Sequence, residues 1–221
     1  MAAPPQVSTP RHALRMRDQE RAGERRTADM ARCTLPTECL SLKCVGTRKG
    51  RLPGGSQLSQ GGIDLARSIG SSIGPFATVV TSVVPRARET AIAMGFAVDY
   101  ELVSLASDPT VYEEAEESEW WRAPHPFVAL AEVIAEGGGY YLYAHSMAAL
   151  WRDLLTPLGG DEAALVIGHS GELEAALIAC LPDADYSTWG ATFGPCEGAR
   201  LHFDGDPPYF RQVEFLRVPS H

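Results

Sequence analysis

Basic and imidazole side chains follow three of the strands that the sequence predicts, at the points where those strands end. Gly46 and Arg48 come after the first strand, and Arg86 comes four residues after the second. His169 directly follows the fourth predicted strand. A guanidinium group binds oxyanions through a planar fork of N–H donors, and an imidazole exchanges protons near neutral pH. Because ligands collect at the carboxyl ends of parallel strands, these three strand ends are candidates for a ligand site at one edge of a sheet.

The elements that would position these residues alternate between strand and helix along the chain. Short runs of β-branched and apolar residues predict strands over 39–45, 77–82, 98–105, 163–168, 198–203 and 212–218. Helical spacing of apolar residues predicts helices over 85–94, 127–135, 141–155 and 172–180, and Ser59 is a good N-cap for one more. The run 113–119 is expected to be a solvated acidic loop. The alternation predicts an α/β fold, a three-layer sandwich with a mainly parallel central sheet and helices on both faces.

The composition of the 221 residues is that of a soluble globular domain, with 45% hydrophobic and 21% charged residues. The formal net charge of −9 argues against nucleic acid and anionic membrane surfaces as partners. No stretch approaches the ~20 consecutive apolar residues of a membrane-spanning helix. The five cysteines form no CxxC pair, which favours reduced thiols and a cytoplasmic location. We expect neither a metal nor a cofactor.

The first 38 residues differ in composition from the rest of the chain. The first thirty of them combine proline, threonine and alanine with a dense alternation of arginine and acidic residues, and the stretch 13–30 has no apolar stripe wide enough to dock. We therefore expect a poorly ordered N-terminal arm over residues 1–38 and one domain over residues 39–221. Residues 1–26 lack the apolar core of a secretory signal, and Met30 offers an alternative translation start.

Three motifs in the domain resemble those of the histidine phosphatase superfamily, which includes the phosphoglycerate mutases. The motifs are LSQGG at 58–62, Ser82 followed by RARETA at 86–91, and VIGH at 166–169. Each motif alone is weak, but three in this order and at these separations are fairly specific. The resemblance extends from about Leu40 to Phe203. It implies the same α/β fold and, as partner, a small phosphorylated or other anionic ligand.

In this family a histidine attacks phosphorus, and the phosphohistidine that results gives its phosphoryl group to water. The resemblance implies that Arg86 binds the phosphate and that His169 is the second histidine of the pocket, which supports the developing charge. It also implies that Gly46 and Arg48 lie at the rim of the phosphate-binding pocket.

The family's general acid protonates the leaving oxygen and lies on the segment after the third strand. Three carboxylic acids of that segment are candidates here: Asp108, Glu113 and Glu114. Their spacing does not distinguish them.

The chain departs from the family at the end of the first strand, where the family has Arg-His-Gly and the histidine is the nucleophile. Alignment on the glycine puts Cys44 and Val45 at the arginine and histidine positions. A valine side chain cannot accept a phosphoryl group. The sequence therefore predicts a histidine-phosphatase-fold protein that keeps an anion pocket and lacks the phosphohistidine nucleophile, a degenerate or repurposed relative of these enzymes.

Two alternatives stand beside this prediction. An active phosphomonoesterase would take its nucleophile from elsewhere, and His12 in the Arg-His-Ala stretch at 11–13 is the first candidate. A serine hydrolase would use Ser146, because AHSMA at 144–148 is similar to the nucleophile elbow of α/β-hydrolases, with alanines in place of the flanking glycines. Apolar spacing through 142–154 favours one continuous helix over such an elbow.

Overall fold

A six-stranded sheet forms the centre of the computed structural model, which describes residues 37–43, 58–106, 109–207 and 209–219. The strand order is β3–β2–β4–β1–β5–β6. The strands are β1 (Thr37–Lys43), β2 (Thr78–Ser82), β3 (Tyr100–Leu102), β4 (Ala163–Gly168), β5 (Gly198–Phe203) and β6 (Phe210–Leu216). Strands β1 to β4 are parallel, whereas β5 is antiparallel to β1 and β6 is antiparallel to β5. The expected, mainly parallel sheet is confirmed.

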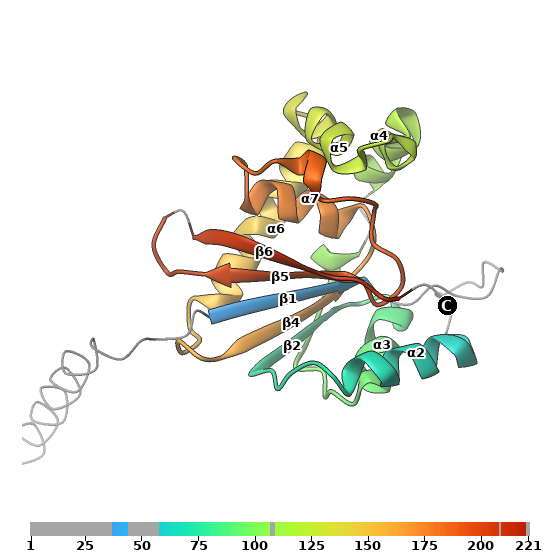
Figure 1. Cartoon of the computed structure of the whole chain (residues 1–221), viewed down its shortest axis with the longest axis vertical. Coiled ribbons are helices and arrows are strands. Elements are labelled where there is room, and N and C mark those ends of the chain that lie inside the picture. The colour runs from blue at the N-terminus through green and yellow to red at the C-terminus, as the bar shows by residue number, and fades with distance from the viewer. Residues whose placement is uncertain (1–36, 44–57, 107–108, 208, 220–221) are drawn as a thin grey trace, which may run out of the picture. The chain divides into compact units, whose positions relative to one another are not determined.

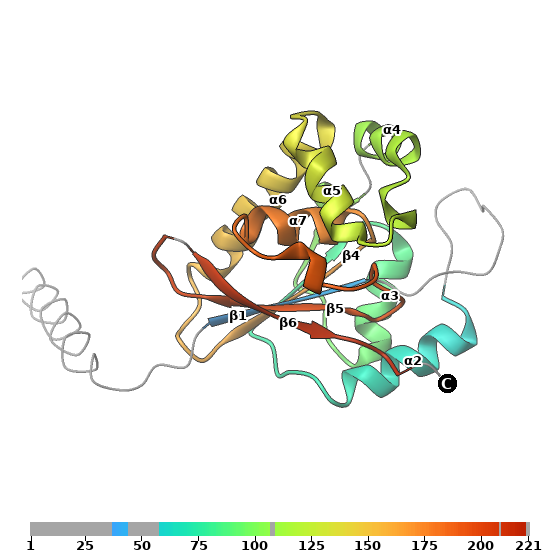
Figure 2. The same ribbon diagram turned by 45° about the horizontal axis from the view of Figure 1, so that its top comes forward.

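Helices cover both faces of this sheet (Figures 1 and 2). They are α2 (Gln60–Gly70), α3 (Pro85–Met94), α4 (Pro109–Ser118), α5 (Pro126–Ala135), α6 (Gly139–Leu155) and α7 (Glu172–Cys180). Side chains of α2 and α3 share one core with Leu40 and Val79, while side chains of α4 to α7 share the other with Cys39 and Val80. Neighbouring strand residues thus point into opposite cores, as the pleat requires. The three-layer α/β fold expected from the sequence is confirmed.

Capping residues in the sequence determine where α2 and α3 begin and end. The N–H of Gly62 donates to Ser59 Oγ at 3.1 Å, so Ser59 caps α2 as predicted. Pro85 opens α3 and Gly95, at φ 94°, ends it. A Cβ on Gly70 would lie 2.1 Å from the carbonyl oxygen of Met94, so α2 and α3 pack closely only because residue 70 is glycine.

The expectation of an acidic loop over 113–119 is wrong, because α4 occupies most of that run. Glutamate and alanine are strong helix formers, and four of the five glutamates in the run lie on the exposed or half-buried side of this helix. Val111, on the opposite side of α4, is 3% exposed and packs into the larger core. The buried face is narrow, so the charged residues dominate the pattern in the sequence.

The third strand is shorter than the predicted 98–105. Only Tyr100–Leu102 pairs with β2, and Val103–Leu105 forms a turn of 3₁₀ helix. The first strand begins at Thr37, two residues before its predicted start.

The described residues all belong to one compact unit. Nearly all of the predicted arm over 1–38 lies outside the described residues, so the arm stays a prediction. Within the described ranges, no helix has both the length and the apolar character needed to cross a membrane.

Candidate functional site

Three parallel strands end at the same edge of the sheet, around the loop that follows β4. In the ladder between β1 and β4, Lys43 lies opposite Gly168, the residue before His169. On the other side of β4, Thr81 of β2 lies opposite Ile167. The loop that carries His169 is therefore flanked by the carboxyl ends of β1 and β2, the edge at which α/β folds bind ligands.

Arg86 and His169 are in direct contact at this edge. Arg86 lies in the first turn of α3, and its Nη2 is 3.0 Å from Nδ1 of His169. A guanidinium has only donors, so Nδ1 is the acceptor and the proton of the neutral ring is on Nε2. Nε2 donates to Ser82 Oγ at 3.0 Å, and the same oxygen accepts the N–H of Val84 at 3.2 Å. The sequence predicted both residues for one pocket, and the fold brings them together.

His169 is neutral at pH 7 in this environment. Its pKa is lowered from 6.5 to about 4, first by burial of the side chain and then by the positive charges of Arg86 and Lys43. The residue is 5% exposed. An imidazole without charge keeps one acceptor and one donor nitrogen, as the two hydrogen bonds require.

Lys43 is a cation close to His169 that the sequence analysis did not select. It is the last residue of β1, it is half-buried, and its Nζ donates to the carbonyl oxygen of Phe193 at 2.7 Å. Its charge is one of those that lower the pKa of His169. The signal in the sequence was a lysine at the end of an apolar strand, a position at which a charge needs a specific partner.

A buried carboxylate anchors the loop that carries His169. Glu174 in the first turn of α7 is fully buried, and its oxygens accept from Ser170 Oγ at 3.0 Å, Gly171 N at 2.6 Å and Phe193 N at 3.0 Å. These bonds join the loop after β4 to the chain around Phe193. Since that segment also accepts from Lys43, the network ties together both sides of the site.

Aromatic residues of the helical layer cover the same loop. Trp120 is 3% exposed, and its Nε1 donates to the hydroxyl of Tyr140 at 3.1 Å. A Cβ on Gly171 would lie 3.3 Å from that hydroxyl and 3.8 Å from the Trp120 ring. Burial and nearby carboxylates raise the pKa of Tyr140, so the hydroxyl stays protonated. Trp120 therefore packs within the protein, and Trp121 beside it is 36% exposed.

The two glutamates predicted as acids occupy different environments on α4. Glu114 accepts the N–H of Gly139 and, at 2.8 Å, the N–H of Tyr140, and so caps the first turn of α6. Glu113 is exposed. The contacts of Glu114 give it a structural role, and a role as general acid stays a prediction for both.

The remaining predicted site residues lie outside the described residues. They are Gly46 and Arg48 at the expected rim, Cys44 and Val45 at the expected nucleophile position, His12, and the acid candidate Asp108.

Ser146 does not lie on a nucleophile elbow. It is inside α6, which runs from Gly139–Leu155 without interruption, and its exposed hydroxyl donates to the carbonyl oxygen of Tyr143 at 2.8 Å. An elbow needs a sharp turn between a strand and a helix. The continuous helix that the apolar spacing favoured is confirmed.

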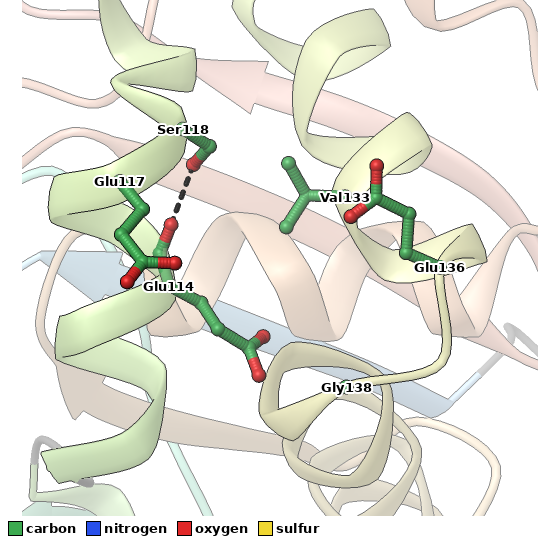
Figure 3. Close-up of a pocket in the computed structure, with 6 residues that line it drawn as sticks. All are labelled: Glu114, Glu117, Ser118, Val133, Glu136 and Gly138. Carbon is green, nitrogen blue, oxygen red and sulfur yellow. Dashed lines mark hydrogen bonds between the residues drawn. The ribbon is translucent and has the colours of Figure 1, made fainter.

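A separate cavity of about 430 Å³ opens between α4, α5 and the start of α6 (Figure 3). It is lined by Glu114, Glu117, Ser118, Val133, Glu136 and Gly138. Three of these are carboxylates, so the charge that lines this cavity is opposite to the charge of Arg86. Among the described residues, no group of three or more histidine, cysteine, aspartate or glutamate side chains is arranged to hold a metal ion.

Comparison with known proteins identifies the fold. No family model and no curated protein sequence matches the chain. Among solved structures, phosphoserine phosphatase from Entamoeba histolytica, in complex with 3-phosphoglyceric acid, is similar with a TM-score of 0.60 and 15% identity, over 82% of this chain and 98% of that chain. A mutant of that phosphatase was determined with phosphoserine and has a TM-score of 0.59.

Two further structures are similar over most of their length. Phosphoglycerate mutase from Bacillus anthracis has a TM-score of 0.59 and 14% identity, over 83% of this chain and 93% of that chain. A mycobacterial glucosyl-3-phosphoglycerate phosphatase has a TM-score of 0.57 and 18% identity, over 83% of this chain and 99% of that chain. All three proteins belong to the histidine phosphatase superfamily. The chain therefore has the histidine phosphatase fold, as the resemblance implied.

Proposed function

We propose that this protein binds a small phosphorylated or other anionic ligand at Arg86 and His169, and that it lacks the phosphohistidine step. The contact between these two residues carries the proposal, because it sets a fork of donors beside a neutral imidazole at the ligand-binding edge of the sheet. The fold supports it as well, since the similar structures include a phosphatase bound to 3-phosphoglyceric acid and to phosphoserine.

The charge around Arg86 favours an anion. Within the described residues no carboxylate forms an ion pair with Arg86, whereas Arg88 of the same helix pairs with Glu101 at 3.3 Å. Only Nη2 of Arg86 is used by His169, so the other N–H groups of the guanidinium can hold phosphate oxygens. A half-buried guanidinium without a carboxylate gains most from a bound oxyanion.

The absence of a phosphohistidine step is inferred from two observations. The sequence has Cys44 and Val45 where the family has arginine and the nucleophilic histidine. His169 is a poor substitute, because Nδ1 accepts from Arg86 and Nε2 carries the proton given to Ser82. Neither nitrogen offers a lone pair for attack on phosphorus in this arrangement.

Calorimetric titration with inorganic phosphate tests the binding site, with a matched pair of variants on one helix. We expect Arg86→Gln to lower the affinity about tenfold or more, since it removes charged hydrogen bonds to the ligand. Arg88→Gln removes an exposed guanidinium from the same helix and should leave the affinity unchanged. Equal affinities in both variants and the unmodified protein would place the anion elsewhere.

Incubation with a radiolabelled phospho-donor tests the missing step. The expected result is no protein-bound label that survives base and is lost in acid, the stability pattern of a phosphohistidine. Label with that pattern would overturn this half of the proposal.

The similar structures also favour a second candidate, an active phosphomonoesterase, because they include two phosphatases. Turnover of p-nitrophenyl phosphate by the unmodified protein, lost in His12→Ala, would support this candidate and identify its nucleophile.

A further inference from the structure

We propose that Lys43 supplies a second positive charge to the anion site of Arg86 and His169, so that the site binds dianions in preference to monoanions. This inference rests on the proposed function and adds a residue and a ligand charge to it. The strand register, the hydrogen bonds of Lys43 and the distribution of charge each support it.

The register of the sheet brings Lys43 to the site. Lys43 pairs with Gly168, the last residue of β4, and His169 directly follows that strand. Adjacent strands lie about 4.8 Å apart, so the end of β1 is next to the loop after β4. Cys39, four residues earlier in β1, belongs to the core beneath α7, and the two-residue repeat of a strand puts Lys43 on that same side. The lysine therefore lies on the side of the sheet from which α7 begins.

The ammonium group of Lys43 is held in place by one hydrogen bond to the protein. An ammonium has three N–H donors, and Nζ gives one to the carbonyl oxygen of Phe193 at 2.7 Å. The N–H of Phe193 is in turn fixed by the fully buried Glu174, which also fixes Gly171 in the His169 loop. Lys43 and the loop are thus positioned by one network before any ligand arrives, which lowers the entropic cost of binding.

The ion pairs of the described residues include neither Lys43 nor Arg86. Within the described ranges no carboxylate forms an ion pair with Lys43 or Arg86, although elsewhere Arg217 pairs with Glu197 and Arg200 with Glu38. His169 follows β4, which lies between β1 and β2 in the sheet, and its imidazole is neutral. Its pKa is lowered first by burial and then by the charges of Arg86 and Lys43. Two positive charges without an ion-pair partner among the described residues match two negative charges on one ligand.

Calorimetric titration with sulfate and with nitrate at equal ionic strength tests both the role of Lys43 and the preference for a dianion. The unmodified protein should bind sulfate, a dianion of phosphate-like shape, more tightly than nitrate. We expect Lys43→Met to weaken sulfate binding about tenfold while changing nitrate binding by less, and Lys43→Arg to keep the affinity within about threefold. Unchanged sulfate binding in Lys43→Met, with weakened binding in Arg86→Gln, would overturn the role of Lys43 and leave the proposed function intact. No binding of sulfate or phosphate by the unmodified protein would instead end the proposed function.

An NMR titration of the His169 ring separates a ligand contact from a fold defect. In the folded Lys43→Met variant the pKa of His169 should rise, because one of the charges that lower it is gone. If Lys43→Met does not fold, Lys43→Arg still tests whether the anion binds next to His169. Addition of sulfate to Lys43→Arg should raise the pKa of His169 as it does in the unmodified protein, and no response in either would contradict the site.

Discussion

His169 is held in one tautomer by its neighbours, and this decides what it can do. Arg86 can only donate to Nδ1, so the ring proton is on Nε2 and is directed at Ser82. Protonation of the ring would turn Nδ1 into a donor that faces a guanidinium. The imidazole is therefore suited to orient Arg86 and is poorly suited to attack a ligand.

The lowered pKa of His169 predicts a loss of stability in mild acid. The folded protein holds this residue neutral with a pKa of about 4, whereas the unfolded chain has the ordinary value of 6.5. Its contribution is therefore complete above pH 6.5 and is lost as the pH falls toward 4, by roughly 2 kcal/mol at pH 5. Urea unfolding at pH 7.5 and pH 5 should show a steeper loss in the unmodified protein than in His169→Asn, and parallel losses would contradict the assignment.

At the level of elements, most of the fold could be predicted because residues such as proline and glycine mark the ends of its helices and strands. Pro85 and Gly95 delimit α3, and the apolar run of β4 ends at a glycine, so both were predicted with the bounds they have. α4 was missed because its buried face is narrow and its charged face wide. Lys43 was missed for another reason: its place beside His169 follows from the pairing of β1 with β4, which no local pattern contains.

The capping role of Glu114 predicts a clear difference between two neighbouring glutamates. Glu114→Ala removes both acceptors from the first turn of α6 and should cost about 1 kcal/mol of unfolding free energy. Glu113→Ala removes an exposed carboxylate and should change it by less than about 0.5 kcal/mol. Thermal or urea unfolding of the two variants measures the difference, and equal effects would mean that the cap contributes nothing.

Gly171 links the loop of His169 to the aromatic residues above it. Its φ is 91°, and a Cβ there would lie 3.3 Å from the Tyr140 hydroxyl. Gly171→Ala should destabilise the protein by about 1–3 kcal/mol and also weaken phosphate binding, because the loop must shift. Gly137→Ala is the control, since φ is 85° there but nothing lies within 4 Å of the added carbon. If both variants bind phosphate equally well, the loop is not part of the anion site.

At the level of the whole molecule, the site differs in charge from the protein around it. The chain has a formal net charge of −9, yet its sheet edge presents Lys43 and Arg86 with no carboxylate paired to them in the described residues. Near the site the two positive charges attract an anion, but at longer range the negative net charge of the protein repels it. Long-range attraction will therefore not speed the approach of an anion. Selective binding must come from short contacts at the edge of the sheet.

A fold shared with phosphatases does not by itself provide their chemistry, and this gives the final prediction. An anion held by Arg86 and Lys43 lacks a partner for covalent transfer, and loss of a covalent nucleophile removes several orders of magnitude of rate. The unmodified protein should hydrolyse p-nitrophenyl phosphate far below ~1 s⁻¹, an ordinary enzyme rate. The double variant Cys44→Arg with Val45→His restores the arginine and histidine of the family's first motif and should raise turnover. Cys44→Arg with Val45→Asn is its control, because it adds the same cation without a nucleophile. Turnover near ~1 s⁻¹ in the unmodified protein would mean that the first strand is misaligned and that the nucleophile lies elsewhere, with His12 as the first residue to replace.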